Sequence, residues 1–185
     1  MKKNLFFILL AFLALSMNAA ERGKFIHVDA TVNKNLKPQL AFAQTRVDGQ
    51  AVTTLLVQTV NTNAYNEFSD ASRILLRFAD DKAVRLNRVP GSNIGTRKYS
   101  KKNGNATISF YETVTEYEVT PEVIEALEAG NAIVKVRVVF KENTAKDYEI
   151  AESYQPRMAA DLLKSYQEAA QKNNKANGDL SDEDF

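Results

Sequence analysis

Short runs in which apolar and polar residues alternate begin at residue 26, and this alternation is typical of half-buried β-strands. The first run covers residues 26–32. Asp48-Gly49 then lies between two extended, β-prone runs at 40–47 and 51–62. A tight hairpin turn needs positive φ angles, which this pair of residues adopts readily, so the pattern predicts a hairpin here.

The following stretch predicts a second hairpin, then a loop and a long strand. Residues 73–89 contain two apolar-rich runs that meet across Asp80-Asp81-Lys82. Residues 90–105 hold one proline and three glycines among polar residues, which predicts a long loop. A long strand is expected at about 106–119.

Two helices are expected in the C-terminal part of the chain. Thr120-Pro121-Glu122 has the features of a helix start, because Thr suits the N-cap, Pro the first helical position and an acid the first turn. Gly130 supplies the stop. Residues 134–140 and 146–152 then predict an antiparallel strand pair. A final helix begins near Pro156, with an apolar stripe that docks on the sheet: Ala159, Leu162, Leu163, Tyr166 and Ala170.

These elements predict an α+β fold. It contains about eight strands in a mainly antiparallel sheet, sandwich-like or curled into a partial barrel, and two helices, one of them C-terminal. We expect a single domain at residues 21–172, followed by a disordered acidic tail at 173–185.

The N-terminus has the pattern of a cleavable secretory signal peptide at residues 1–20. Two lysines precede an unbroken apolar run of eleven residues, Leu5 to Leu15, which is about half the length that a membrane-spanning helix needs. Cleavage is expected near Ala20, or after Ser16, where the small residues fit the cleavage rule better. No later run approaches membrane length, so we expect a soluble periplasmic or secreted protein without a transmembrane segment.

Composition removes several classes of function. Without the two lysines of the signal segment, the chain's 24 basic residues become 22 against 23 acidic ones, a net charge of −1 that argues against a dedicated nucleic-acid binder. The absence of cysteine excludes disulfides, thiolate chemistry and cysteine-ligated zinc. No phosphate-binding loop and no calcium-loop spacing occur, so we expect no metal and no other cofactor.

Candidate catalytic groups are few. His27 is the only histidine and lies near no nucleophile motif, so we interpret it as a solvent-facing strand residue. Glu112, Glu116 and Glu118 share one face of the long strand, a spacing that permits the carboxylate pair of a glycosidase. The chain has no tryptophan to serve as a sugar platform, which makes an exposed strand face the simpler interpretation. We therefore assign no catalytic residue.

Charge is segregated between two neighbouring segments. Residues 82–102 contain seven basic residues and no acid, and residues 103–134 contain six glutamates and no base. One interpretation pairs the strand at 83–89 with the strand at 106–119, which sets the arginines of the first against glutamates of the second. The other interpretation is a binding site for an anionic partner, such as lipid headgroups, lipopolysaccharide or an acidic glycan. Its residues are Arg85, Arg88, Arg97, Lys98, Lys101 and Lys102.

Three features together resemble uncharacterised exported domains of Gram-negative anaerobes. They are the lysine-rich signal, the hairpin sequence Leu75-Leu76-Arg77-Phe78-Ala79-Asp80-Asp81, and the Thr120-Pro121-Glu122 helix that leads into residues 134–140 and a closing helix. The resemblance covers most of residues 24–170 and is one of cadence. It implies no activity and supplies no functional residues.

Three functions remain open from the sequence. The leading hypothesis is an exported, non-enzymatic envelope or secreted domain that binds or supports another molecule, such as an envelope protein. The second is a binder of an anionic lipid or glycan through a basic loop at 97–102. The third is a hydrolase that uses the strand glutamates.

Overall fold

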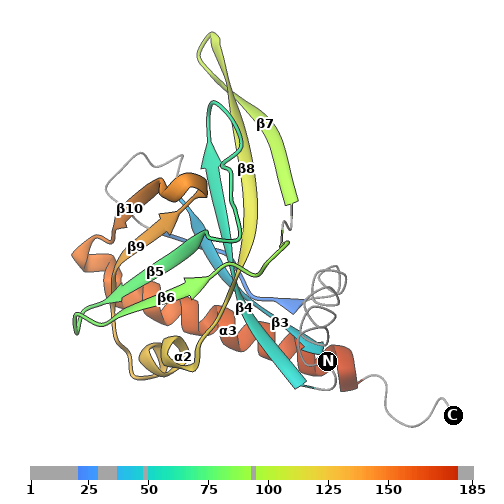
Figure 1. The fold of residues 1–185 in the computed structure, drawn as a ribbon, viewed down its shortest axis with the longest axis vertical. Helices are drawn as coiled ribbons and strands as arrows, with labels where there is room; N and C mark the ends of the chain where they lie inside the picture. The colour runs from blue at the N-terminus through green and yellow to red at the C-terminus, as the bar shows by residue number, and fades with distance from the viewer. Residues whose placement is uncertain (1–20, 29–36, 48–49, 93–94, 179–185) are drawn as a thin grey trace, which may run out of the picture.

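The computed structural model describes residues 21–28, 37–47, 50–92 and 95–178. Within these residues the chain forms ten strands in two antiparallel sheets together with two α-helices, the second of them C-terminal (Figure 1). The predicted α+β class is therefore confirmed. The predicted signal segment at 1–20 and the predicted turn at Asp48-Gly49 lie outside the described residues. No helix in the described ranges is long and apolar enough to span a bilayer.

The first sheet has six strands, and its longest members are β4 and β8. Its order is β1-β3-β4-β8-β7, with β2 also paired to β3. The hairpin strands predicted on either side of Asp48-Gly49 are confirmed, because β3 and β4 pair antiparallel from Gln39↔Gln58 to Val47↔Gln50. The strands are β1 Glu21–Arg22, β2 Ile26–His27, β3 Gln39–Val47, β4 Gln50–Asn61, β7 Gly95–Asn103 and β8 Ala106–Glu118.

The second sheet has four strands in the order β10-β9-β5-β6. The predicted 73–89 hairpin is confirmed, with its turn at Asp80-Asp81-Lys82, and so is the predicted pairing of the last two strands. Asp81 has a φ of 64°, a left-handed conformation that aspartate tolerates in tight turns. The strands are β5 Arg73–Phe78, β6 Ala83–Asn87, β9 Ile133–Val139 and β10 Ala145–Glu149.

Both predicted helices are present. Helix α2 spans Pro121–Glu128, with Thr120 at its N-cap and Pro at its first position, and Gly130 (φ 74°) follows it. Helix α3 spans Gln155–Gly178, so residues 173–178 of the predicted disordered acidic tail are helical, and residues 179–185 of that tail lie outside the described residues. A short 3₁₀ turn at Glu152–Tyr154 and a tight turn at Lys141–Asn143, in which Glu142 and Asn143 have left-handed φ angles, complete the described elements.

The predicted loop at 90–105 is wrong over most of its length. Residues 95–103 form β7, which pairs with β8 in an unbroken register from Gly95↔Val114 to Asn103↔Ala106. The segment shows no apolar alternation because it is an edge strand with most of its side chains in solvent. Its backbone pairing with β8, and not a buried face, holds it extended.

One apolar core joins the two sheets and both helices. It takes alternate residues from the inner faces of the sheets, including Leu55, Val57 and Tyr117 of the first and Leu76 and Val136 of the second. Helix α3 covers the first sheet, with its Tyr166 ring 5.7 Å from that of Phe42 in an edge-to-face contact. Its buried positions differ in part from the predicted stripe and include Met158, Ala159, Leu162 and Ala169.

Helix α3 docks directly onto a break between the two first strands. Gly23 follows β1, and its backbone N–H donates to the Phe42 carbonyl at 2.9 Å. The Phe42 N–H of β3 donates to Ser165 Oγ of the helix at 3.1 Å. If β1 and β2 formed one continuous strand, this N–H would pair with that strand instead. A Cβ on Gly23 would lie 2.0 Å from the Ser165 carbonyl oxygen, so this contact requires glycine.

Gly23→Ala should therefore destabilise the fold. The added methyl group cannot fit against helix backbone, and overpacking of this kind costs about 1–3 kcal/mol and occasionally more. Urea unfolding followed by circular dichroism measures the effect. Gly95→Ala is the matched control, because a Cβ at Gly95 meets nothing within 4 Å. Equal unfolding midpoints for the two variants would show that helix and strand do not approach as closely as described.

Candidate functional site

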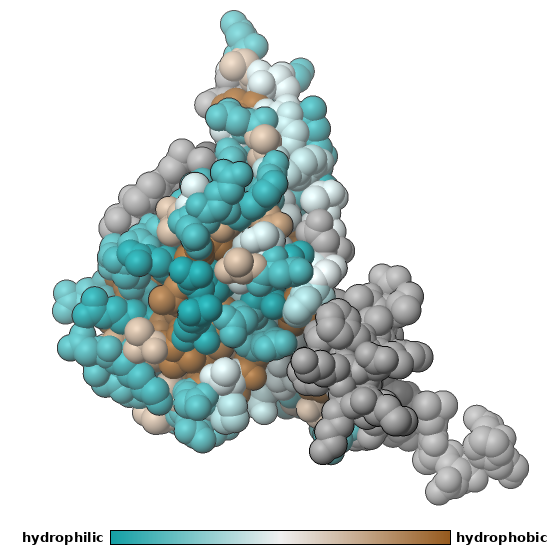
Figure 2. Space-filling view, viewed as in Figure 1, coloured by the Kyte–Doolittle hydropathy of each residue, from teal (hydrophilic) through white to brown (hydrophobic). Residues whose placement is uncertain are grey.

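The β7–β8 hairpin projects from the body of the molecule (Figure 1). Strand β8 pairs with β4 only from Tyr111 to Glu118, whereas its pairing with β7 runs from Ala106 to Val114. Residues 106–110 therefore have β7 as their only strand neighbour among the described residues. We refer to residues 95–114 as the arm. Its surface in the space-filling view is mainly hydrophilic or near neutral (Figure 2).

The arm brings together four of the six cations singled out in the sequence. Arg97, Lys98, Lys101 and Lys102 all lie on β7, and all are exposed. Successive side chains of a strand point to opposite faces, so Arg97 and Lys101 share one face while Lys98 and Lys102 share the other. The sequence predicted a loop as the support of these four cations, whereas they lie on an edge strand.

On the first face, aromatic rings hold the cations in place. Tyr99 stacks on Phe110 with ring centroids 5.2 Å apart and an interplanar angle of 15°. The Arg97 guanidinium lies 5.1 Å from the Tyr99 centroid, and Lys101 Nζ lies within 6 Å of both rings. Arg97 also forms an ion pair with Glu112 at 2.9 Å. Cation–π contacts of this kind favour fixed positions for the charges.

On the second face, Lys98 Nζ lies 5.1 Å from the ring centroid of Tyr111. Tyr111 in turn contacts Tyr65 edge to face at 5.2 Å, which links the arm to the connection between β4 and β5. Within the part of the chain that the structure describes, no carboxylate lies within ion-pair distance of Lys98, Lys101 or Lys102. Among the described residues, the charges of these three lysines are therefore not compensated by a carboxylate.

Arg85 and Arg88 do not join the arm. Arg85 is exposed on the outer face of the second sheet, where its Nε donates to Asn87 at 3.2 Å. Arg85 lies on β6, which ends at Asn87 and pairs with β5, and β8 lies between β4 and β7. The predicted pairing of 83–89 with 106–119 is therefore wrong apart from a single Arg88↔Tyr117 bridge. The acidic block is met by β7 instead, through the ion pair of Arg97.

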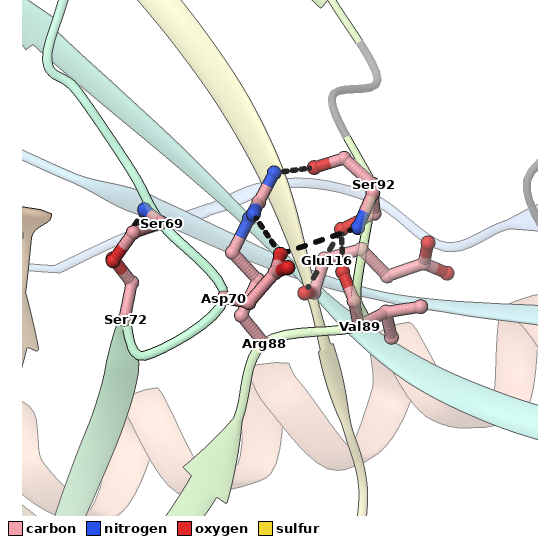
Figure 3. A network of polar contacts seen from close by, with 8 residues as sticks. Ser69, Asp70, Ser72, Arg88, Val89, Ser92 and Glu116 are labelled. Atoms are coloured by element: carbon pink, nitrogen blue, oxygen red, sulfur yellow. Dashed lines mark hydrogen bonds and ion pairs between the residues drawn. The ribbon is translucent and has the colours of Figure 1, made fainter.

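Arg88 is a buried structural residue. Only 7% of it is exposed, and its guanidinium donates to Asp70 at 3.0 Å and to the Ser92 carbonyl (Figure 3). The adjacent Val89 N–H donates to the Glu116 carbonyl of β8 at 2.9 Å. The arginine therefore ties the turn before β5 to the segment that leads into the arm.

The Asp70–Arg88 pair should matter more for stability than an exposed ion pair. Asp70→Asn removes the charge that compensates a buried guanidinium and is expected to cost about 1–3 kcal/mol. Glu67→Gln is the control, because Glu67 and Asp70 side chains are both 71% exposed, but the partner of Glu67, Lys141, is 51% exposed. The control should cost much less than Asp70→Asn, because ion pairs between exposed side chains contribute little to stability. Chemical denaturation of both variants checks this, and a control that costs as much as Asp70→Asn would contradict the account.

The strand glutamates share one face but lie in three different environments. Glu112 is engaged by Arg97, Glu118 is exposed, and Glu116 is only 2% exposed. Burial raises the pKa of Glu116, while a hydrogen bond from Thr54 opposes that shift. Its Oε2 has no partner among the described residues. His27 is exposed on β2, as expected, and the described residues contain no acidic or histidine cluster suited to a metal.

Glu116 should make stability depend on pH. Its pKa is raised in the folded state, so the folded chain holds the proton more tightly than the unfolded chain does. The destabilisation caused by burying the charged carboxylate is absent below the ordinary pKa of 4.5. It develops as the pH rises through that value to the folded pKa. Glu116→Gln should therefore stabilise the protein more at pH 7 than at pH 4.

Thermal unfolding at both pH values, with the exposed Glu118→Gln as control, measures this difference. The control removes a carboxylate from the same strand face without relieving burial. A Glu116→Gln variant whose gain is the same at pH 4 and pH 7 would contradict the account.

A groove of about 320 Å³ lies beside the arm, and the sequence did not identify it. It is formed by the start of the β4–β5 connection and the turn between β9 and β10. The sequence pattern gave Lys141-Glu142-Asn143-Thr144 as an ordinary polar turn. The one unusual feature of this segment in the sequence is Glu142, because tight hairpin turns prefer Asn or Gly at such a position. The lining residues are Asn61, Tyr65, Asn66, Glu67, Phe140, Lys141, Glu142, Thr144, Ala145 and Lys146.

Comparison of the chain with known protein families, with curated proteins and with solved structures finds no match.

Proposed function

We propose that the protein is an exported, non-enzymatic domain that binds an acidic glycan along the arm. The observation that carries the proposal is the charge of β7. Lys98, Lys101 and Lys102 are exposed and, across the described ranges, have no carboxylate partner. Exposed cations held on a projecting strand attract anions and raise their local concentration.

The spacing of the cations suits an extended polyanion. Side chains on one face of a strand recur at every second residue, so Lys98 and Lys102 stand about 13 Å apart on the same face. Arg97 and Lys101 repeat this spacing on the other face. Acid groups repeated along a polymer can meet such a row, whereas a single small anion can meet one cation at a time.

A glycan fits the arm better than a lipid surface does. The tip of the arm carries the exposed residues Gly104 and Asn105, neither of which has an apolar side chain, whereas segments that enter a bilayer present apolar side chains. The cations also point to both faces of β7, so no orientation lays all four against one flat surface. The Phe110 ring is only 5% exposed and is therefore not available for insertion.

The export and the lack of enzymatic activity rest on other observations. Residues 1–20 have the pattern of a secretory signal, and export would bring the arm to the polysaccharides that surround cells. The strand glutamates are divided between an ion pair, the interior and open solvent, and the sequence around His27 contains no nucleophile motif. A binding role uses the groups that the arm does present.

Charge reversal on the arm tests the proposal. The triple change Lys98→Glu, Lys101→Glu and Lys102→Glu should weaken binding to an acidic polysaccharide such as polygalacturonate at least tenfold, or about 1.4 kcal/mol. Binding of the unchanged protein should also weaken at high salt, because exposed charges are screened. Isothermal titration calorimetry measures both effects.

The matched control reverses three exposed lysines outside the arm, Lys82, Lys164 and Lys175, and so changes the net charge equally. It should retain most of the affinity. Equal losses in the two triple variants would reduce the effect to net charge and contradict a site on the arm. Binding of the unchanged protein to anionic vesicles but to no acidic glycan would favour a lipid ligand instead.

A further inference from the structure

The groove beside the arm combines an aromatic ring, amides and paired charges. Tyr65 is the one large hydrophobic residue that is exposed among those described, at 39%, and its ring contacts Tyr111 of the arm. Asn61 donates to Asn66 Oδ1 at 3.4 Å, while the buried Asn66 Nδ2 has no acceptor among the described residues. The groove thus sets an aromatic ring beside two side-chain amides, Asn61 and Asn66.

The charges that line the groove balance one another. Lys141 forms an ion pair with Glu67 at 2.9 Å, and Lys146 Nζ lies 5.8 Å from the centroid of Phe140. Glu142 supplies a second carboxylate. Two lysines against two glutamates favour neither a lone anion nor a metal ion, and the charged rim does not suit an acyl chain. Mixed donors and acceptors beside an aromatic ring match a polyhydroxylated ring.

Backbone strain at the rim points to the same place. Glu142 and Asn143 both have left-handed φ angles, 60° and 58°, as in a type I′ turn. Asn tolerates this conformation, but Glu is an unfavourable choice for it, and Asn or Gly would relieve the strain. Strain of this kind is characteristically kept at functional sites. The carboxylate of Glu142 lines the groove, which gives a reason to keep it.

We infer that the groove is a saccharide subsite that takes one ring of the same glycan whose acid groups bind the arm. This inference rests on the proposed function and specifies its ligand. Tyr65 packs against the sugar face, and Asn66 and Glu142 bond to its hydroxyl groups. The contact of Tyr65 with Tyr111, over which Lys98 lies, makes the groove and the second face of the arm one continuous surface. The volume is at the lower end of the range for small-ligand sites, about 300–1,000 Å³.

The test separates stability from binding at two neighbouring residues. Glu142→Gly and Asn143→Gly both relieve a left-handed φ, so both should raise the urea midpoint. Only Glu142 lines the groove, so only Glu142→Gly should weaken glycan binding, by about fivefold or more. Tyr65→Ala, a change at an exposed side chain, should weaken binding as well. If Glu142→Gly and Tyr65→Ala both bind as well as Asn143→Gly, the inference is overturned.

Matched ligands distinguish this inference from the proposal on which it rests. The probes are a panel of uronate and sulfated tetrasaccharides, each with its methyl-esterified or desulfated neutral counterpart. Groove variants should lose affinity for the acidic and neutral members of a pair alike, whereas arm charge reversal should affect only the acidic member. Loss in the arm variants alone overturns the groove subsite and leaves the proposed function standing. Loss in the groove variants alone overturns the role of the arm, and binding to no pair overturns both.

Discussion

The pairing of β8 with β4 is the interaction on which the arm depends. Strand β8 has thirteen residues. Its C-terminal half pairs with β4 in the register Asn61↔Tyr111 to Thr54↔Glu118, and its Tyr117 packs in the core. The same strand continues outward and provides the only described template for β7. A row of cations can therefore stand away from the body without a hydrophobic face of its own. The core secures the base of the arm, and backbone hydrogen bonds carry it outward.

The site follows from this arrangement. Cross-strand neighbours set Tyr99 on Phe110 and Lys98 beside Tyr111, so aromatic rings of the paired strands hold the charges that solvent would otherwise let move freely. Tyr111 is also where β8 first meets β4, and there the arm reaches Tyr65 and the groove. The cations of the arm and the groove with its balanced charges thus meet at Tyr111.

The sequence predicted the elements that bury an apolar face. The 73–89 hairpin is recognisable from its alternating apolar residues, because one face of each strand is buried. The helix at Thr120-Pro121 is recognisable from its capping residues, because the first backbone N–H groups of a helix need partners. Strand β7 buries no such face. It is held extended by its pairing with β8, which follows it in the sequence, and only β8 has a recognisable strand pattern. Taken alone, residues 90–105 show glycines, a proline and charged residues, and this composition predicts a loop.

The site was partly accessible from the sequence for a related reason. The block of cations is visible in the residue order, and four of its six members do lie together. Arg88 differs because Asp70 and Ser92, which hold it inside, are brought there by the fold and not by the strand pattern. The groove depends on two segments some eighty residues apart, at 61–67 and 140–146, so no local pattern could assemble it.

The most direct test of the account is the location of the glycan on the chain. Backbone amide NMR during titration with an acidic oligosaccharide would report it residue by residue. The account predicts that the largest shift changes fall in β7, at Tyr111 and at the groove residues Tyr65, Asn66 and Glu142. Changes confined to the charged outer face of the second sheet, or their absence at saturating ligand, would contradict it.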